Sequence, residues 1–322
     1  MADLTQSLRK AAEAIAGAKS LAISCHVSPD GDALGSALAL AHAARGAGHE
    51  AVVSFGEPFR VPGTLQFLDT SPLVPPDLFP AAPECMVVFD AGSADRLGEL
   101  AASAAAARVL VVVDHHKSTS GEFGDVLVVD PTAAASGQLT VALLDVLGWK
   151  IDTVTAQCLM TAIVTDTGRF QYSATTGEVL RIAGRLVDAG VRPEVIGQAV
   201  YEAVPFGYLR VASLMLARAT LEADLGLVWS WVEEADVAGS GAAWADLDGL
   251  IDDLRIAREA GVAALLKETS QGWKVSLRSR GAVDVGAIAE ANGGGGHHNA
   301  AGFTLVAEPA AVLDVIRKGL RG

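Results

Sequence analysis

Short apolar runs rich in β-branched residues alternate with helical patterns through the first 190 residues. Five of these runs have the length of a strand, namely SLAISC (20–25), EAVVSF (50–55), CMVVF (85–89), VLVVV (109–113) and DVLVV (125–129). Continuous apolar strands are typical of a sheet that is covered on both faces. Helical segments between them favour parallel pairing. We therefore predict an α/β fold whose N-terminal domain is an open, mainly parallel sheet with helices on both faces.

The C-terminal part of the chain has a different pattern. Its strand-like runs are LGLVWSWV (225–232), VAALLKE (262–268), WKVSLRS (273–279) and GFTLVA (302–307), with fewer helices between them. This pattern predicts a smaller α+β domain with a mixed sheet. We place the N-terminal domain at residues 1–190, a helical linker at 191–221 and the C-terminal domain at 222–322.

Composition restricts the classes of function. The formal net charge of −14 argues against coating long nucleic acids, but it leaves room for a small anionic substrate held by metal ions. Cys25, Cys85 and Cys158 form no CxxC pair, so we expect reduced, mostly buried thiols. The sequence offers neither a secretory signal nor an apolar run long enough for a membrane helix, which predicts a cytoplasmic protein without a membrane partner.

Titratable residues follow the first strand in SCHVSPDGDALGS. His26, Asp30 and Asp32 come within seven positions, and the glycine between the aspartates permits a tight turn. Two carboxylates cannot be buried together without a compensating cation, and a His/Asp/Asp group suits a divalent ion such as Mn²⁺. The alternative is a turn whose aspartates face water, and this motif alone leaves both interpretations open.

Other aspartates and histidines end the following apolar segments. Asp90 ends one predicted strand, Asp114, His115 and His116 end the next, and Asp166 closes an apolar helix. In an open α/β sheet, groups at the carboxyl ends of neighbouring strands converge on one crevice. Five of the seven histidines lie within the candidate motifs, which favours a metal site over isolated structural histidines.

The C-terminal domain contains a second unusual stretch, NGGGGHHNAAGF (292–303). Its glycines could let backbone N–H groups approach an anion closely, although a flexible hinge is an equal alternative. Arg278 and Arg280 lie on the same side of the preceding strand by its two-residue period. Arg278 could bind a phosphate with two hydrogen bonds, and Arg280 could equally be a solvated surface charge.

Taken together, these motifs resemble those of the DHH phosphoesterase superfamily. HVSPDGDALGS, the Asp90 strand end, DHH and TDTG are similar to its four metal motifs, and GGGGHHNAAGF with SLRS resembles the DHH-associated C-terminal domain. Order, spacing and length resemble the stand-alone oligoribonuclease/phosphoadenosine-phosphate phosphatase branch, the nanoRNases. The resemblance covers nearly the whole chain.

The resemblance implies a centre of two divalent ions, Mn²⁺ or else Mg²⁺, in the N-terminal domain. Its metal ligands would be His26, Asp30, Asp32, Asp90, His115 and Asp166, with Asp90 bridging the ions. Asp114 would support a ligand, and His116 would face the reacting phosphate. The substrate's remaining phosphate and ribose would be held by Arg278, Ser279, Gly293, Gly294, Gly295, Gly296 and His297. His298 stands where many relatives carry a basic residue, and we assign it no role.

The implied activity is hydrolysis of very short RNAs, including linear dinucleotides, to nucleoside monophosphates. A companion activity would convert 3′-phosphoadenosine 5′-phosphate to AMP and phosphate. The alternatives are a cyclic-dinucleotide phosphodiesterase, a manganese pyrophosphatase and, outside the enzymes, a metal-dependent nucleotide-sensing protein. The resemblance also makes a homodimer a reasonable expectation.

Overall fold

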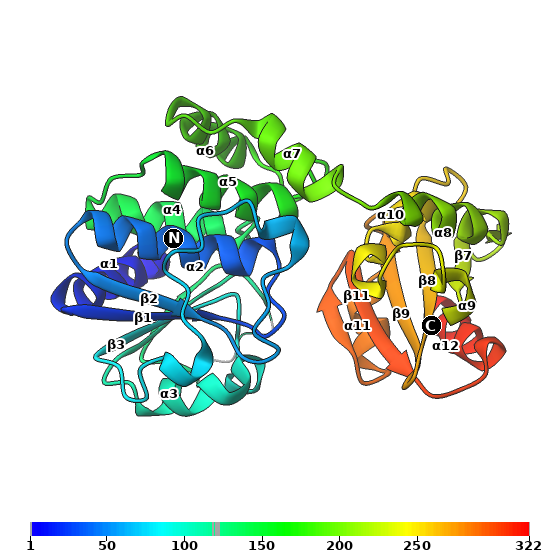
Figure 1. Ribbon diagram of the computed structural model, residues 1–322, viewed down its shortest axis with the longest axis horizontal. Helices are drawn as coiled ribbons and strands as arrows, with labels where there is room; N and C mark the ends of the chain where they lie inside the picture. Colours follow the sequence, from blue (N-terminus) through cyan, green and yellow to red (C-terminus); the bar gives the residue numbers. More distant parts are fainter. Residues whose placement is uncertain (1, 118, 120–122, 322) are drawn as a thin grey trace. The chain divides into compact units, whose positions relative to one another are not determined.

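A computed structural model of the protein describes residues 2–117, 119 and 123–321, and divides the chain into two compact units (Figure 1). The units comprise residues 1–203 and 204–322, and each is described by itself. The segment that we expected to be a linker is helical, but its two helices belong to different units. Helix α7 (Pro193–Tyr201) buries Ile196 in the core of the first unit, whereas α8 (Phe206–Ala217) buries Val211 and Met215 in the second.

The first unit is built on a five-stranded sheet that confirms the predicted parallel α/β fold. The strands are β1 (Ser20–Cys25), β2 (Glu50–Ser54), β3 (Cys85–Phe89), β4 (Leu110–Asp114) and β5 (Val126–Val129). Their order is β2-β1-β3-β4-β5, and all four pairings are parallel. The carboxyl ends of β1, β3 and β4, neighbours in the sheet, therefore meet at the same edge.

Helices cover both faces of this sheet. One face carries the larger core with α1 (Ala2–Gly17), α2 (Gly31–Gly46), α4 (Ser136–Leu147) and α5 (Thr153–Asp166), and α6 (Gly177–Asp188) packs on α5 (Figure 1). The other face carries a smaller core with α3 (Ala101–Ala106) and the 3₁₀ helix η3 (Ala94–Leu100). Short 3₁₀ helices also occupy Gly63–Leu65 and Pro76–Leu78.

Close packing of α2 against α5 depends on Gly35. A Cβ atom at this position would lie 2.6 Å from the carbonyl oxygen of Cys158, so any larger residue would force the helices apart. The contact brings the start of α2, which carries Asp30 and Asp32, beside the end of α5, which carries Asp166.

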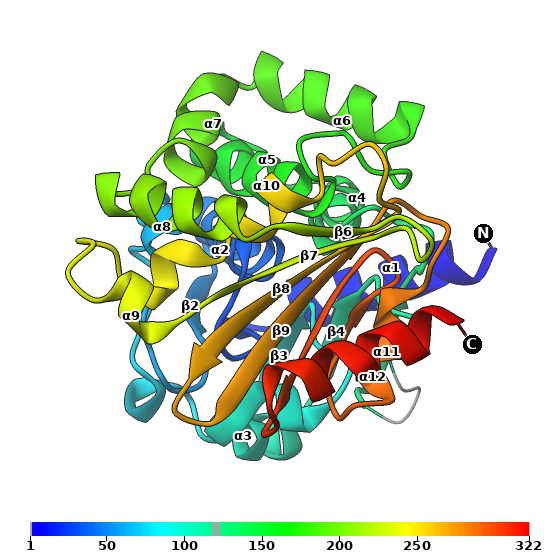
Figure 2. The same ribbon diagram turned by 90° about the vertical axis from the view of Figure 1, so that its right-hand side faces the viewer.

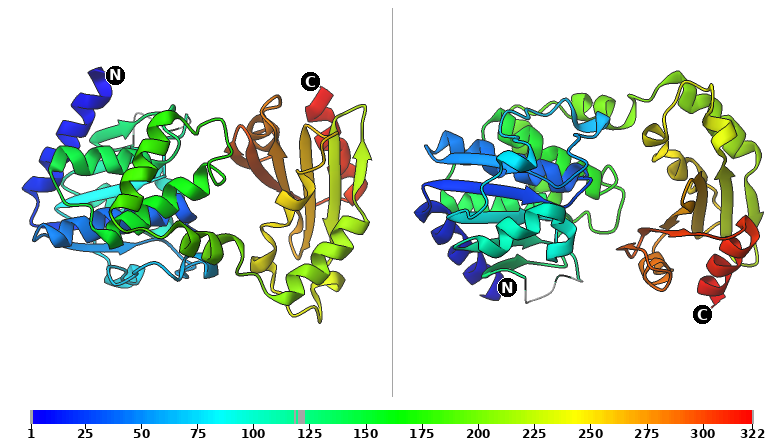
Figure 3. Two further views of the ribbon diagram at one scale, coloured as in Figure 1. Left: turned by 90° about the horizontal axis from the view of Figure 1, so that it is seen from above. Right: turned by 60° about the horizontal axis from the view of Figure 1, so that its bottom comes forward.

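The second unit has a mixed sheet of order β10-β11-β9-β8-β7-β6. The strands are β6 (Thr220–Glu222), β7 (Leu227–Val232), β8 (Val262–Thr269), β9 (Gly272–Ser279), β10 (Gly295–His297) and β11 (Ala300–Leu305). One face packs on α8 and α10 (Leu250–Leu254), and the other on α11 (Val285–Glu290) and the C-terminal α12 (Pro309–Arg321), as Figures 2 and 3 show. The short helices α9 (Glu234–Val237) and η4 (Trp244–Leu247) complete this unit.

The glycine run forms an edge strand. Residues 295–297 make up β10, which pairs antiparallel with β11. A Cβ atom at Gly294 would lie 2.1 Å from the carbonyl oxygen of Gly302, and one at Gly296 would lie 2.5 Å from that of Ala300. Glycine is therefore required for the close approach of the two backbones, which argues against a freely flexible hinge.

Two expectations about the whole chain can also be compared with the structure. Cys25, Cys85 and Cys158 are all buried, as predicted, and each is a free thiol. Throughout the part of the chain that the structure describes, every helix is too short or too polar to cross a membrane.

Candidate metal centre

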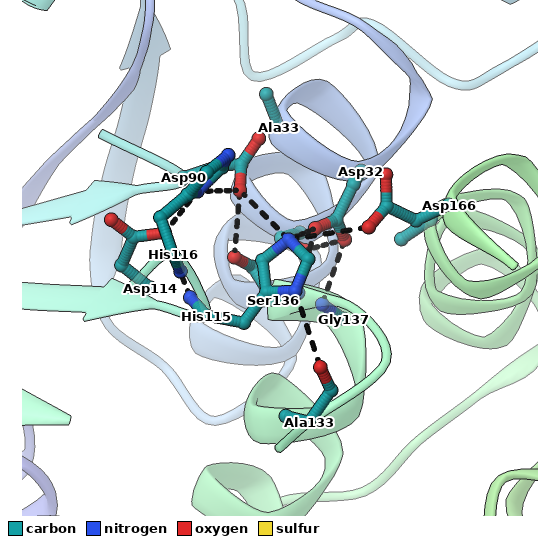
Figure 4. A network of polar contacts seen from close by, with 12 residues as sticks. Asp32, Ala33, Asp90, Asp114, His115, His116, Ala133, Ser136, Gly137 and Asp166 are labelled. Carbon is teal, nitrogen blue, oxygen red and sulfur yellow. Dashed lines mark hydrogen bonds and ion pairs between the residues drawn. The ribbon is translucent and has the colours of Figure 1, made fainter. Parts of the chain in front are cut away.

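Histidines and aspartates from distant parts of the chain gather at the carboxyl edge of the first sheet (Figure 4). His26 follows β1, Asp90 follows β3, and Asp114 is the last residue of β4. The starts of α2 and α4 and the end of α5 complete the group. The convergence that we predicted from the strand ends is therefore present.

Asp90 lies at the middle of this group. Its Oδ2 is 3.5 Å from His26 Nε2, and its Oδ1 is 3.5 Å from His115 Nε2. The backbone of Asp90 has a φ of 55°, a left-handed conformation that is uncommon for a residue with a side chain. The two oxygens of Asp90 thus face two different histidines.

His115 Nε2 faces a ring of carboxylates (Figure 4). It lies 3.2 Å from Asp166 Oδ2 and 3.7 Å from Asp32 Oδ2, in addition to its approach to Asp90. The other ring nitrogen, Nδ1, is 3.2 Å from the carbonyl oxygen of Ala133. Because a carbonyl oxygen only accepts hydrogen bonds, Nδ1 carries the proton and the lone pair of Nε2 points toward the carboxylates.

His26 is oriented in the same way. Its Nδ1 donates to the carbonyl oxygen of Val27 at 2.8 Å, and its Nε2 faces Asp90 and, at 3.9 Å, Asp30 Oδ2. A backbone hydrogen bond at one ring nitrogen commonly orients a metal-binding histidine through the other. Both histidines therefore present a lone pair where a cation could accept it.

Asp32 is fully buried and receives the N-terminus of α4. Its Oδ2 accepts the N–H of Ser136 at 2.6 Å, and its Oδ1 accepts the N–H of Gly137 at 2.8 Å. The hydroxyl of Ser136 donates to Asp90 Oδ1 at 3.1 Å. Neither Ser136 nor Gly137 was among the site residues predicted from the sequence. The signal for them was a Ser–Gly pair at the start of a helix, where free N–H groups favour an anion.

Asp30 lies at the start of α2, and Asp166 lies at the end of α5. Asp30 caps α2 by accepting the N–H of Ala33 at 3.0 Å through Oδ1, which leaves Oδ2 toward His26. Asp166 is the last residue of α5. Soon after it, Gly168, Arg169 and Phe170 all have left-handed backbones, with φ of 54°, 63° and 63°. Such a run for two residues with side chains marks a strained turn of the kind found at functional sites.

Burial and mutual repulsion perturb the carboxylates. Burial raises the pKa of Asp32 and of Asp166 well above the usual range, and the charges of neighbouring aspartates raise both further. Burial also acts to raise the pKa of Asp90, but the close contact with His26 and the positive charge of the neighbouring histidines when they are protonated outweigh it, so this pKa is lowered. A site with this many buried carboxylates requires positive charge.

His116, the third residue of the DHH motif, contacts Asp114. His116 Nδ1 donates to Asp114 Oδ1 at 2.7 Å, and the same oxygen accepts the N–H groups of His115 and His116. Asp114 Oδ2 accepts the hydroxyl of Thr119. Burial acts to lower the pKa of His116, but Asp114 and Asp90 outweigh it, so the pKa is raised despite the opposing charge of Arg96.

These donors form groups that fit divalent ions. One group is His26, Asp30 and Asp90, a second is Asp32, His115 and Asp166, and a third is Asp90, His115 and His116, with donor atoms within 4.8 Å of one another in each. Carboxylate oxygens with imidazole nitrogens suit borderline or hard divalent cations.

The remaining predicted residues lie in the second unit. Ser279 is buried at the end of β9, and its hydroxyl accepts the N–H of Gly281. Arg278 is half-buried with Nε 3.9 Å from Asp252 Oδ1. Arg280 lies past β9 and donates to the carbonyl oxygens of Arg255 and Arg258 at 2.8 and 3.5 Å. Gly293 to Gly296 precede or form β10, and the side chain of His297 lies outside what the structure describes.

Known protein families match both the N-terminal and the C-terminal part of the chain. The DHH family N-terminal domain matches residues 20–163, and the DHHA1 domain matches residues 227–319. The bifunctional oligoribonuclease and PAP phosphatase NrnA of Thermus thermophilus is 33% identical over 288 residues, covering 88% of this chain and 83% of the relative. The chain belongs to the DHH family. This DHH protein is therefore a hydrolytic phosphoesterase.

Other relatives extend the match. The protein of the same name from Bacillus subtilis is 25% identical and covers 87% of each chain. An exopolyphosphatase-related protein from Bacteroides fragilis superposes with a TM-score of 0.91 over 98% of this chain and 96% of that one, at 23% identity. The last likeness concerns the fold alone. The DHH and DHHA1 matches confirm the family resemblance found in the motifs.

Proposed function

We propose that this DHH phosphoesterase hydrolyses very short RNAs, including linear dinucleotides, to nucleoside monophosphates. The reaction would use two divalent ions per chain, and Mn²⁺ is the metal that we expect. A companion reaction would convert 3′-phosphoadenosine 5′-phosphate to AMP and phosphate. The observation that carries the proposal is the position of Asp90 between His26 and His115, because one carboxylate there faces two separate groups of donors.

The residues of the first unit would bind the two ions in two groups. His26, Asp30 and Asp90 would hold one ion, and Asp32, His115 and Asp166 the other, with Asp90 shared. Bound divalent ions would supply a nucleophile by lowering the pKa of water toward about 7, and would neutralise charge on the phosphoryl oxygens. The backbone carbonyl partners of His26 and His115 would keep both Nε2 atoms aimed at the ions.

His116 would act on the substrate. Its Nδ1–H is held by Asp114, and its Nε2 would address a phosphoryl or leaving oxygen of the substrate. A protonated imidazole there could stabilise developing charge or protonate the leaving group. Asp114 would be a positioning residue for this ring.

The choice of substrate rests on the relatives and on the second unit. The relatives from Thermus thermophilus and Bacillus subtilis are both named as oligoribonuclease and PAP phosphatase. In this chain, Arg278, Ser279 and the backbone of Gly293 to Gly296 would hold the remaining phosphate and ribose, which would favour very short substrates. The formal net charge of −14 agrees with exclusion of long nucleic acids.

The test is a substrate panel with Mn²⁺ and product separation. The panel contains pApA, phosphoadenosine phosphate, cyclic di-AMP, pyrophosphate and a long RNA. We expect AMP from the first two and little product from the others. Cleavage of only cyclic di-AMP or only pyrophosphate would overturn the proposal, as would tight binding of pApA without turnover. Asp90→Ala should be inactive, and Asp95→Ala, an exposed aspartate in the next turn, should retain activity.

A further inference from the structure

Arg96 lies near the carboxyl edge of the first sheet and belongs to neither the metal nor the substrate assignments above. Arg96 lies in η3, six residues after Asp90, and its side chain is exposed. It forms no side-chain hydrogen bond or ion pair with any residue that the structure describes. Arg108, Arg181, Arg185 and Arg192 of the same unit each pair with a carboxylate.

The backbone of Arg96 is held firmly at the edge of the site. Its carbonyl oxygen accepts the N–H of Val27, the residue after His26, at 2.9 Å. Two residues later, Gly98 has a φ of 58°, and a Cβ atom there would lie 3.1 Å from the Val27 side chain. The next residue, Glu99, accepts the N–H of Glu57 at 3.0 Å. The segment therefore cannot move away from β1 without breaking several contacts.

Charge makes the position of Arg96 significant. The aspartates at the candidate metal centre are Asp30, Asp32, Asp90, Asp114 and Asp166, and an incoming phosphate adds further negative charge. The hydrogen bond from Val27 places Arg96 beside the residue that follows His26, and the positive charge of Arg96 also acts to lower the pKa of the His116 imidazole. An arginine keeps its charge at any working pH, and its planar guanidinium matches two phosphate oxygens.

We infer that Arg96 binds a non-bridging oxygen of the scissile phosphate, next to His116, as a substrate-contacting residue of the phosphoesterase reaction. The inference rests on the proposed function for its location, because it takes the reacting phosphate to lie at His116. Arg96 would thus place a permanent positive charge, carried by η3, beside the metal ligands. The ligand class is a phosphodiester or phosphomonoester oxygen, whatever the attached nucleoside.

The experiment compares Arg96→Ala and Arg96→Lys with wild type at saturating Mn²⁺. The substrates are pApA and the generic diester bis-p-nitrophenyl phosphate. A charge-assisted hydrogen bond of the usual strength predicts a fall in kcat/KM of about 10- to 100-fold for Arg96→Ala on both substrates. Arg96→Lys should lose less. Added guanidinium chloride, but not sodium chloride, should restore part of the Arg96→Ala activity.

Arg108→Ala is the matched control, because Arg108 is an exposed arginine that precedes β4 and pairs with Glu84 away from the carboxyl edge. It should match wild type. Arg96→Ala activity within about twofold of wild type would overturn the inference, and so would a loss that guanidinium does not relieve. If wild type cleaves the generic diester but not pApA, the proposed function fails, while Arg96 is still tested on the generic diester.

Discussion

His116 Nδ1 lies 2.7 Å from Asp114 Oδ1, and this contact orients the histidine of the DHH motif that we propose acts on the substrate. Asp114 is fully buried at the end of β4, and its Oδ1 also accepts the N–H groups of His115 and His116. The carboxylate is thus held by two backbone N–H groups as well as by the ring that it orients.

Replacing this imidazole tests its role directly. His116→Gln should lower kcat on pApA by about 10²- to 10⁴-fold, as expected for loss of a general acid. Bound metal should remain, because the ligands proposed for both ions are intact. His42→Gln in α2, where the ring bonds the carbonyl oxygen of Asp69, is the control. Activity of His116→Gln within tenfold of wild type would remove His116 from the reaction.

Ser136 offers a test of ligand support. Its hydroxyl donates to Asp90 Oδ1, so Ser136→Ala should leave the shared carboxylate less well oriented. We expect the Mn²⁺ concentration for half-maximal activity to rise about 10- to 100-fold, with activity recovering at excess Mn²⁺. Ser103→Ala, a buried serine in α3 on the other face of the sheet, should show wild-type Mn²⁺ dependence. Identical titrations for both variants would contradict the supporting role.

The two arginines at the end of β9 should behave differently. Arg278→Ala should reduce kcat/KM on pApA by about 10- to 100-fold, with a much smaller effect on bis-p-nitrophenyl phosphate, which lacks a second phosphate. Arg280→Ala should keep wild-type kinetics, because the guanidinium of Arg280 donates its hydrogen bonds to the carbonyl oxygens of Arg255 and Arg258. Equal losses in the two variants, or equal losses on the two substrates, would argue against phosphate recognition by Arg278.

A stability prediction concerns Asp236 in the second unit. The hydrogen bond from Arg218 lowers the pKa of Asp236, which also accepts the N–H of Glu233. A lowered pKa contributes stability above the unfolded value of about 3.9, and that stability is lost as pH falls through the folded pKa. Asp236→Asn should therefore cost about 1–3 kcal/mol at pH 7.

Calorimetry of full-length protein at several pH values would measure this effect. The difference in melting temperature between wild type and Asp236→Asn should be largest at neutral pH and should become smaller below about pH 4. Glu194→Gln, at an exposed ion pair with Arg192, is the control and should match wild type. A gap that stays constant or widens at acid pH would rule out the ion pair as its source.

Much of the first unit and its site could be predicted from sequence. The apolar runs ending at Cys25, Phe89 and Val113 indicated buried parallel strands, and the rule for carboxyl ends then placed His26, Asp90 and His115 together. Each of these predictions depends on a local pattern. The segment 191–221 contains α7 and α8, and the unit that each helix packs against depends on apolar residues such as Ile196 and Val211, whose partners lie far away in sequence.

The contacts that sequence reasoning missed arise from tertiary placement. Ser136 meets Asp32 across 104 residues of sequence, and no spacing rule connects a helix start to a carboxylate so far away. The sequence predicted either a glycine loop that approaches an anion or a flexible hinge, and did not predict a strand, for which glycine has a low propensity. Close packing against Gly302 and Ala300 overrides that propensity and forms β10.

The central claim, that Asp90 joins two ion sites, can be measured most directly by titrating chelator-treated protein with Mn²⁺ and following free and bound ion by electron paramagnetic resonance. We predict two bound ions per chain with a spin-coupled spectrum, because ions that share one carboxylate lie within a few ångströms of each other. Asp90→Ala should lose the coupling. One ion per chain, or two ions without coupling in wild type, would contradict a binuclear centre at Asp90.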